Sequence, residues 1–362
     1  MSSVYIHIPF CKHICNYCDF AKMYNNHELI SNYLDGLEKE IKLKYKGEVL
    51  KTLYIGGGTP SSLTIDELRR LFEIISIFKY NDIEFTFECN VEDISDELLK
   101  FLKENNVNRL SIGIESTHDK YLKYLGRTYK REDIIKNIEI AKKNFDNISV
   151  DLIYALPGET IEELKEDIDI IKSFNIPHIS TYSLIIEPHT VFYNKGVSNI
   201  DEELDREMYD LICDSLSDYK HYEISNFGIS GYESKHNLVY WNNEEYYGFG
   251  LGSGGYIDNI RYLNTRNIME YIKGKYILES DKLTKDEIVE NAFILGFRKI
   301  DGINKKDFNE RYNLDINNIS IINNLLDEDK IEDDGLNIKI KKEYIYTSNS
   351  ILCEFIGGKY YE

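Results

Sequence analysis

The segment CKHICNYCDF places Cys11, Cys15 and Cys18 on one short stretch of a chain that has six cysteines in 362 residues. A C-x-x-x-C-x-x-C spacing brings three thiols together, and clustered thiols are ligands for zinc and iron. Structural zinc takes four ligands; His7 or His13 could complete such a site, but the spacing matches no common zinc finger. An iron–sulfur cluster held by three thiolates leaves one iron open for another ligand. The pattern favours such a cluster over zinc, and a disulfide least.

Composition narrows the class of protein. Hydrophobic residues make up 42% of the chain, enough for a large core, and the length fits about two domains or one barrel with an appendage. No apolar run approaches the roughly 20 residues that span a membrane. The net charge of −20 argues against broad electrostatic binding to nucleic acid or anionic lipid. The N-terminal SVYIHIPF is typical of a strand rather than a targeting signal, so we expect a cytoplasmic protein.

The first half of the chain alternates apolar runs with amphipathic segments. Strands are predicted at residues 4–8, 52–55, 83–87, 109–112, 148–153 and 179–184. Helices are predicted at residues 28–45, 65–78, 95–104, 132–144 and 161–174. Six strands separated by helices predict a parallel sheet of βαβ units, either a barrel or a shortened, open version of one.

Residues that can bind ligands follow these strands closely. The cysteine segment comes after the first strand, GGGTPSS after the second, and LPGET after the fifth. Glu88, Glu115 and Asp151 lie at or toward the ends of the third, fourth and fifth strands, and Tyr182 and Ser183 near the end of the sixth. Because the carboxyl ends of the strands form the ligand-binding rim of α/β barrels, these residues predict one shared site.

The pattern changes beyond about residue 200. A helical segment at 203–217 gives way to an aromatic, glycine-rich stretch, and from about residue 281 three helices precede a short strand pair around LNIKIKKEYIYTS. We predict a barrel domain at 1–220, a connecting segment at 221–280 that contains HNLVYW, and a small winged-helix-like domain at 281–362.

Six segments identify a family resemblance, in this order: YIHIPFCKHICNYCDF, YIGGGTPSSL, RLSIGIES, LGRTY, DLIYALPGET and YEISNF…HNLVYW. They run from residue 4 to about 255 and together resemble the oxygen-independent coproporphyrinogen III oxidase family of the radical S-adenosylmethionine (SAM) superfamily, and within it most the haem-chaperone branch. The resemblance implies an α/β fold, a partial (β/α)6 TIM-like radical SAM barrel with the family's C-terminal domain. It also implies a [4Fe–4S] cluster on the three cysteines, whose open iron binds SAM and whose electron cleaves it.

The resemblance assigns cofactor contacts to matched positions. Gly57, Gly58 and Thr59 would contact the amino-acid end of SAM, with Tyr5 near the methionine moiety and Glu88 against the same molecule. From the residues alone GGGTP could be a phosphate loop, but no G-K-[ST] follows. In the family's oxidase a second SAM sits beside the first. The positions that would line it here are Tyr17, Gly58, Thr59, Glu115, Arg127, Asp151 and Ser183.

Three positions depart from the family pattern. Glu115 stands where glutamine is usual and adds a negative charge at the second SAM position. Val91 replaces a common proline, and GLGSGGY lacks the histidine of the family's G-x-G-A-H stretch.

The resemblance leaves two functions, and which of them applies decides whether the protein is an enzyme. The oxidases carry a further cysteine two residues after the third, where this chain has Phe20, and HNLVYW matches the haem motif of the chaperone branch. We therefore predict a haem chaperone, with coproporphyrinogen III oxidase as the alternative. His236 of HNLVYW is predicted to contact haem and is a candidate iron ligand; the residues alone favour a histidine inside an aromatic core. Implied partners are haem or another tetrapyrrole, haem-accepting apoproteins and an electron donor such as flavodoxin or ferredoxin.

Overall fold

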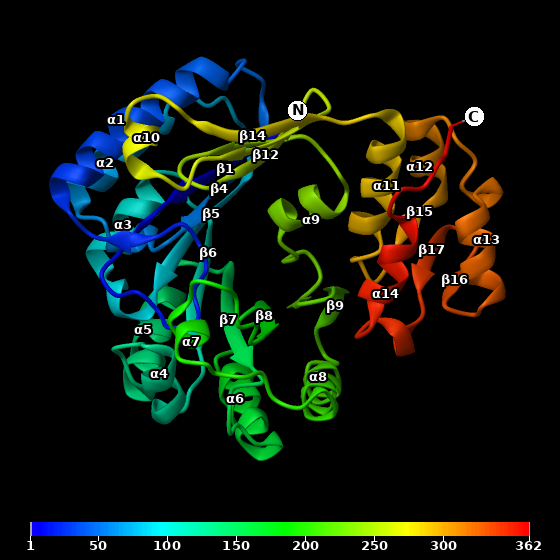
Figure 1. Cartoon of the computed structure of the whole chain (residues 1–362). Coiled ribbons are helices and arrows are strands. Elements are labelled where there is room, and N and C mark those ends of the chain that lie inside the picture. Colours follow the sequence, from blue (N-terminus) through cyan, green and yellow to red (C-terminus); the bar gives the residue numbers. More distant parts are fainter. Residues whose placement is uncertain (1, 362) are drawn as a thin grey trace.

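The computed structural model describes residues 2–361, and its centre is one curved, open sheet of twelve strands (Figure 1). All six strands predicted from the sequence are present, and each pairs in parallel with the next. They are β1 (Ser2–Ile8), β4 (Leu50–Gly57), β5 (Glu84–Asn90), β6 (Arg109–Glu115), β7 (Ile148–Tyr154) and β8 (His178–Ser183). The expected partial α/β barrel is confirmed.

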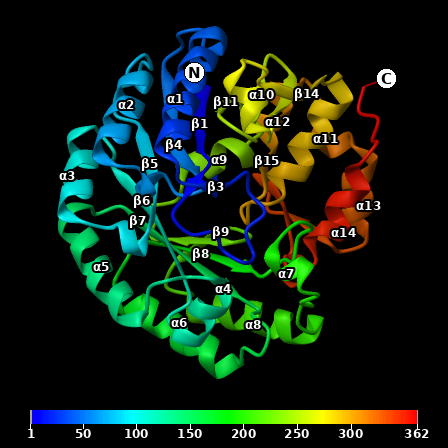
Figure 2. The same ribbon diagram turned by 60° about the vertical axis from the view of Figure 1, so that its left-hand side comes forward.

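Helices cover the outer face of these strands, as Figure 2 shows. Those on the predicted segments are α1 (His27–Lys44), α2 (Ile65–Ile75), α3 (Asp96–Glu104), α5 (Arg131–Asn144) and α6 (Ile161–Ser173). Several begin at a side-chain cap: Thr64 and Thr160 each form a reciprocal capping box, and Ser95 accepts from the Leu98 amide. Each cap fixes the residue at which its helix begins. The loops that join the strands to these helices therefore stay short and lie together at the carboxyl ends of the strands. Two helices complete this layer, α4 (Asp119–Leu125) and α8 (Glu202–Ser215).

The segment 221–280, predicted as a connection, supplies strands to both ends of the same sheet. β10 (Asn226–Gly228) pairs antiparallel with β8 and with β9 (Lys220–Glu223). At the other end β11 (Tyr246–Phe249) pairs in parallel with β1, a seventh parallel strand that the periodicity did not reveal. Antiparallel strands continue from it: β12 (Gly254–Ile257), β13 (Ile260–Asn264) and β14 (Ile277–Lys282). Between these two groups α9 (Lys235–Trp241) carries the HNLVYW motif and packs on β4.

The C-terminal part forms a separate layer beside the open sheet (Figure 1). Its elements are α11 (Lys285–Gly296), β15 (Ile303–Asn304), α12 (Lys305–Tyr312), α13 (Ser320–Asp327), β16 (Ile331–Asp333), β17 (Asn337–Ile340) and α14 (Ser348–Leu352). The three short strands pair in the order β15-β17-β16. Only the first half of the predicted strand pair is a strand. Residues 342–344 form a 3-10 turn instead, and that turn buries Ile345 as a strand would have done.

Across residues 2–361, no helix has both the length and the apolar run needed to cross a bilayer.

A buried carboxylate joins the strand extension to α1. Glu40 has no exposed surface and accepts hydrogen bonds from the Gly250 amide (2.9 Å), the Asn264 amide group (2.7 Å) and the Tyr271 hydroxyl (2.5 Å). Nearby, the Tyr33 hydroxyl donates to the carbonyl oxygen of His7 at the end of β1. The extension is thereby tied to the strand from which the cysteine segment departs.

We predict that Glu40→Ala destabilises the fold by about 3 kcal/mol or more, because three buried donors lose their acceptor. Urea unfolding measures the difference. The matched control is Glu38→Ala on the same helix: Glu38 is partly exposed and ion-paired with Lys42 and Arg70, so its loss is expected to cost less than about 1 kcal/mol. Equal costs for the two variants would contradict the role given to Glu40.

Candidate functional site

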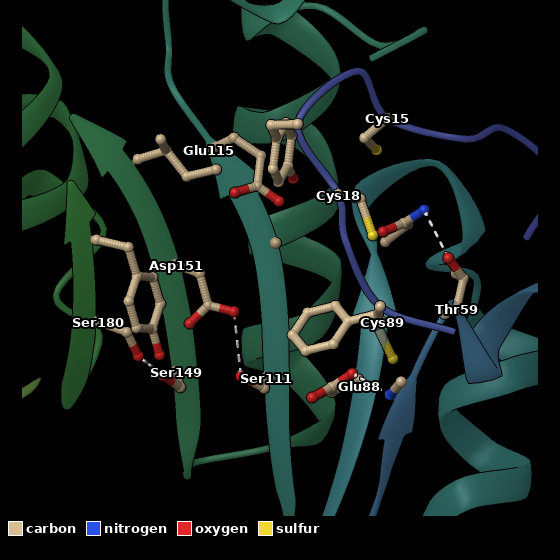
Figure 3. Close-up of a pocket in the computed structure, with 18 of the residues that line it drawn as sticks. Cys15, Cys18, Thr59, Glu88, Cys89, Ser111, Glu115, Ser149, Asp151 and Ser180 are labelled. Carbon is tan, nitrogen blue, oxygen red and sulfur yellow. Dashed lines mark hydrogen bonds between the residues drawn. The ribbon is translucent and has the colours of Figure 1, made fainter. Parts of the chain in front are cut away.

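The parallel strands enclose a cavity of about 350 Å³ that opens at their carboxyl ends. Every second residue of β6 lines it, from Arg109 through Ser111 and Gly113 to Glu115, as the two-residue period of a strand requires. Strands β7 and β8 contribute in the same way: their inward residues are Ser149, Asp151, Ile153, His178, Ser180 and Tyr182. Figure 3 shows Ser111, Glu115, Ser149, Asp151 and Ser180, five of the residues of these strands, lining one space. The cavity is therefore the interior of the partial barrel.

Most of the predicted site residues meet in this cavity. Twelve of the fourteen line it, namely Cys11, Cys15, Tyr17, Cys18, Gly57, Gly58, Thr59, Glu88, Glu115, Arg127, Asp151 and Ser183. The other two, Tyr5 and His236, do not line it. Phe20, where the oxidases would carry a cysteine, lies at the mouth with 60% of its surface exposed.

The cysteine segment forms a loop closed at its base. Short strands β2 (Phe10–Cys11) and β3 (Met23–Tyr24) pair in parallel, and the Asn25 amide donates to the Cys11 carbonyl at 3.0 Å. All three cysteines are free thiols. Burial raises the pKa of Cys11 to about 11 and also raises the pKa values of Cys15 and Cys18, so ligand binding here must displace protons.

The donor set suits a cluster better than a single ion. Among residues 2–361, no three or more His, Cys, Asp or Glu side chains are grouped as they are around one metal ion. Zinc would hold its thiolates at about 2.3 Å, which brings the sulfur atoms to within about 4 Å of one another. The three cysteines that line the cavity match in number the three thiolate ligands of a four-iron cluster that keeps one iron open.

His7 is excluded as a fourth ligand by its hydrogen bonds. It is buried, and its Nε2 lies 2.7 Å from the Ala21 carbonyl while its Nδ1 lies 3.0 Å from the Tyr5 hydroxyl. A carbonyl only accepts, so Nε2 carries the proton and Nδ1 accepts from Tyr5. Burial lowers the pKa of His7 to about 4, which keeps the ring neutral. His7 therefore joins β1 to Ala21, at the C-terminal end of the cysteine loop, and the Tyr5 hydroxyl fixes the orientation of the His7 ring.

The three glycines at the end of β4 are required by close approach. A Cβ at Gly56 would lie 2.6 Å from the Glu88 carboxyl group, one at Gly57 2.6 Å from the His7 ring, and one at Gly58 2.9 Å from the Cys11 sulfur. Gly57 also has φ of +118°, which side chains rarely allow. The Gly58 amide donates to the Ile8 carbonyl at 2.8 Å. Residues 56–58, which we call the glycine segment, thus pack directly against the start of the cysteine loop.

Glu88 faces the cavity from the third strand, and both carboxylate oxygens are engaged (Figure 3). Oε2 accepts from the Gly57 amide at 2.8 Å and Oε1 from the Tyr54 hydroxyl at 2.7 Å. Burial raises the pKa of this carboxyl group. Glu88 therefore holds the glycine segment in place and presents its carboxylate to a ligand in the cavity.

The rim carries a buried ion pair between Glu115 and Arg127. Arg127 also donates to the Tyr17 hydroxyl at 2.9 Å and to the Asn90 side-chain oxygen at 3.0 Å. The charge that Glu115 adds in place of the family's glutamine is thereby neutralised within the chain. At another part of the rim Ser183 donates to Asp205 at 2.6 Å.

A polar chain lies deeper in the cavity. Asp151 accepts from Ser111 at 3.4 Å, and its pKa is raised to about 7 by burial and by the charge of Glu115. Beside it Ser149 contacts both Ser180 (3.3 Å) and His178 (2.7 Å), as Figure 3 shows in part. The sequence reasoning did not select the serines, His178 or Arg109; alternation inward from Glu115 and Asp151 would have found them.

His236 does not reach the cavity. It is 1% exposed; its Nδ1 lies 2.7 Å from the Thr52 hydroxyl and its Nε2 2.8 Å from the Tyr240 hydroxyl. Burial, and then the charge of Arg109, lower its pKa to about 3. Neither nitrogen is free for iron in this conformation. The motif meets the cavity through Asn237 instead, because one residue along α9 turns the side chain by about 100°.

Comparison with known proteins gives three findings. The model of the Radical SAM superfamily matches residues 5–171. The chain is 39% identical to the heme chaperone HemW of Bacillus subtilis, over 99% of this chain and 100% of that protein, and 38% identical to that of Lactococcus lactis, over 98% and 97%. The solved structure of coproporphyrinogen III oxidase (HemN) from Escherichia coli superimposes with a TM-score of 0.85 at 20% identity, over 98% of this chain and 90% of that one. The last likeness is one of fold.

We predict that Gly57→Ala destabilises the apoprotein by about 3 kcal/mol, because the methyl group must displace the His7 ring in addition to straining the backbone. Gly158→Ala is the matched control: its φ is also positive (+82°), but no atom lies within 4 Å of the added carbon, so about 1 kcal/mol is expected. Urea unfolding of both variants decides. Equal midpoints would contradict the packing given to the glycine segment.

Proposed function

The chain belongs to the HemW family of radical SAM haem chaperones, and from that membership we propose that it binds haem and transfers it to haem-requiring proteins. Similarity over the full length to a heme chaperone at 39% identity carries the proposal. The shared fold with coproporphyrinogen III oxidase makes that activity the alternative.

We assign the cluster to Cys11, Cys15 and Cys18. Three free thiols on one loop that lines the cavity support this assignment. When bound, a cluster with three thiolate ligands supplies one-electron chemistry and one iron open to SAM. The chain's own part is to hold the loop: Ala21 is tied to His7 at one end and the Gly58 amide to Ile8 at the other.

SAM is proposed to bind between this loop and the glycine segment. There Gly57, Gly58 and Thr59 bring backbone close to the thiols, and Glu88 supplies a carboxylate oxygen to a cationic amino group. Tyr5 would act through His7 rather than by touching SAM. A second SAM would have to compete with Glu115 for Arg127, since these side chains are already paired.

Haem is proposed to enter the cavity through its mouth. Phe20, Tyr182 and Ile185 line it, and each is between 43% and 64% exposed. Large exposed apolar side chains around a pocket suit a flat macrocycle. His236 remains a proposed haem contact, but it could ligate iron only if α9 released its hydrogen bonds to Thr52 and Tyr240.

The proposed partners follow from the same function. Haem-accepting apoproteins would receive the ligand, and a flavodoxin or ferredoxin would supply the electron. We place the protein in the cytoplasm. Its net charge of −20 makes nucleic acid an improbable partner.

We predict that anaerobic reconstitution gives about one [4Fe–4S] cluster per chain and that Cys→Ala at position 11, 15 or 18 abolishes it. Iron content and visible absorbance measure the outcome. Cys213→Ala, which changes a thiol far from the cavity lining, is the control and keeps the cluster. A triple variant that still holds four irons with an unchanged spectrum would refute the assignment.

We predict that the reconstituted protein, supplied with SAM, reductant and coproporphyrinogen III, forms no protoporphyrinogen IX. The reason is Phe20, which replaces the additional cysteine of the oxidases. The Escherichia coli oxidase serves as positive control, and product is followed by chromatography. Steady formation of protoporphyrinogen IX would contradict the chaperone function and support the oxidase function instead.

We predict that His236→Ala weakens haem binding and shifts the Soret band, with the cluster intact. His221→Ala is the control, since His221 is a half-buried histidine that stacks on Phe227 and does not line the cavity. Titration of haem into both variants measures affinity and band position. If both match the wild type, His236 is a core residue that holds α9 on β4.

A further inference from the structure

Arg109 lies at the inner end of the cavity, six residues before Glu115 on the same strand. At about 3.3 Å per residue their Cα positions are about 20 Å apart along the strand. Arg109 is only 2% exposed and is one of the largest buried side chains. A buried guanidinium keeps its charge, and a buried charge is costly unless it is paired.

No partner within the described chain accounts for this charge. Arg127 forms an ion pair with Glu115, whereas Arg109 forms none among residues 2–361, and its Nε is buried without a hydrogen-bond partner. Three carboxylates on the neighbouring strands are already engaged by other donors: Glu84 by the Lys235 and His236 amides, Glu88 by Gly57 and Tyr54, and Asp151 by Ser111.

The surroundings are built of donors and neutral groups. Thr86, directly beside Arg109 in the register of β5 and β6, is fully buried with an unpartnered hydroxyl. Ser149, Ser234 and Asn237 line the cavity nearby. His178 and His236 stay neutral, because burial and the charge of Arg109 lower their pKa values. Within residues 2–361, the missing component is an acceptor in ion-pair contact with the Arg109 guanidinium.

We propose that Arg109 binds a carboxylate group of the ligand that fills the cavity, with the Thr86 hydroxyl and the Asn237 amide beside it. A guanidinium and a carboxylate form two parallel hydrogen bonds, which fixes orientation as well as charge. The carboxylate belongs to a tetrapyrrole propionate or to an amino-acid end of SAM. Only this choice of ligands rests on the proposed function.

The test compares ligands that differ in one carboxylate. Haem and haem dimethyl ester form the first pair, and SAM and its decarboxylated analogue form the second. Each is titrated into cluster-containing wild type, Arg109→Gln and the control Arg261→Gln, whose guanidinium lies outside the cavity against Asn243. In the wild type the carboxylate form of one pair is bound more tightly, and Arg109→Gln reduces that preference about 10- to 100-fold while Arg261→Gln leaves it unchanged.

Arg109→Lys keeps the positive charge but cannot form two parallel hydrogen bonds to a carboxylate. It is used if Arg109→Gln does not fold, and it is expected to lose part of the preference for the carboxylate form. A loss confined to haem identifies the propionate, and a loss confined to SAM identifies the amino acid. If Arg109→Gln keeps the wild-type preference for the carboxylate form in both ligand pairs, the proposal for Arg109 is wrong. If this variant also binds haem as the wild type does, the proposed function is not affected. Failure of the wild type to bind haem at all contradicts the proposed function instead, and the SAM pair then decides on Arg109.

Discussion

The close approach of the glycine segment to the cysteine loop is the constraint on which the site depends. Gly57 leaves room for the His7 ring and Gly58 for the Cys11 sulfur. His7 in turn holds the Ala21 carbonyl, so both ends of the loop are fixed by neighbouring strands. A side chain at either glycine would move the loop away from β4, and the three thiols would no longer face the cavity together.

Burial then sets the electrostatics of the interior. Removal from water raises the pKa values of Glu88 and Asp151, which makes these carboxyl groups easier to protonate than they are in water. At the rim the charge of Arg127 is matched by Glu115, and at the inner end the charge of Arg109 has no match within the chain. A ligand that spans the cavity therefore meets an acceptor-rich middle and a cationic inner end.

The sequence predicts what depends on local pattern and fails where tertiary contacts decide. The six strands and their rim residues follow from alternation and from motifs at strand ends, and the structure has them. Strand β11 is missed because YYGF is short and lies in a glycine-rich stretch, and its pairing with β1 is a tertiary contact between segments far apart in the sequence. For His236, helical spacing gives the face shared with Tyr240 but not what that face packs against; Thr52 of β4 occupies it. Arg109 carries no motif, and its lack of a partner is visible only in three dimensions.

The proposed function requires that three thiolates hold a cluster whose fourth iron is open to SAM within this cavity. The most direct measurement is the EPR spectrum of the reduced, anaerobically reconstituted protein, recorded with and without SAM. We expect the signal of a reduced [4Fe–4S] cluster and a clear change in its g values when SAM is added, because SAM would occupy the open iron. A signal that SAM leaves unchanged, or a reconstituted protein that holds zinc in place of iron, would contradict the claim.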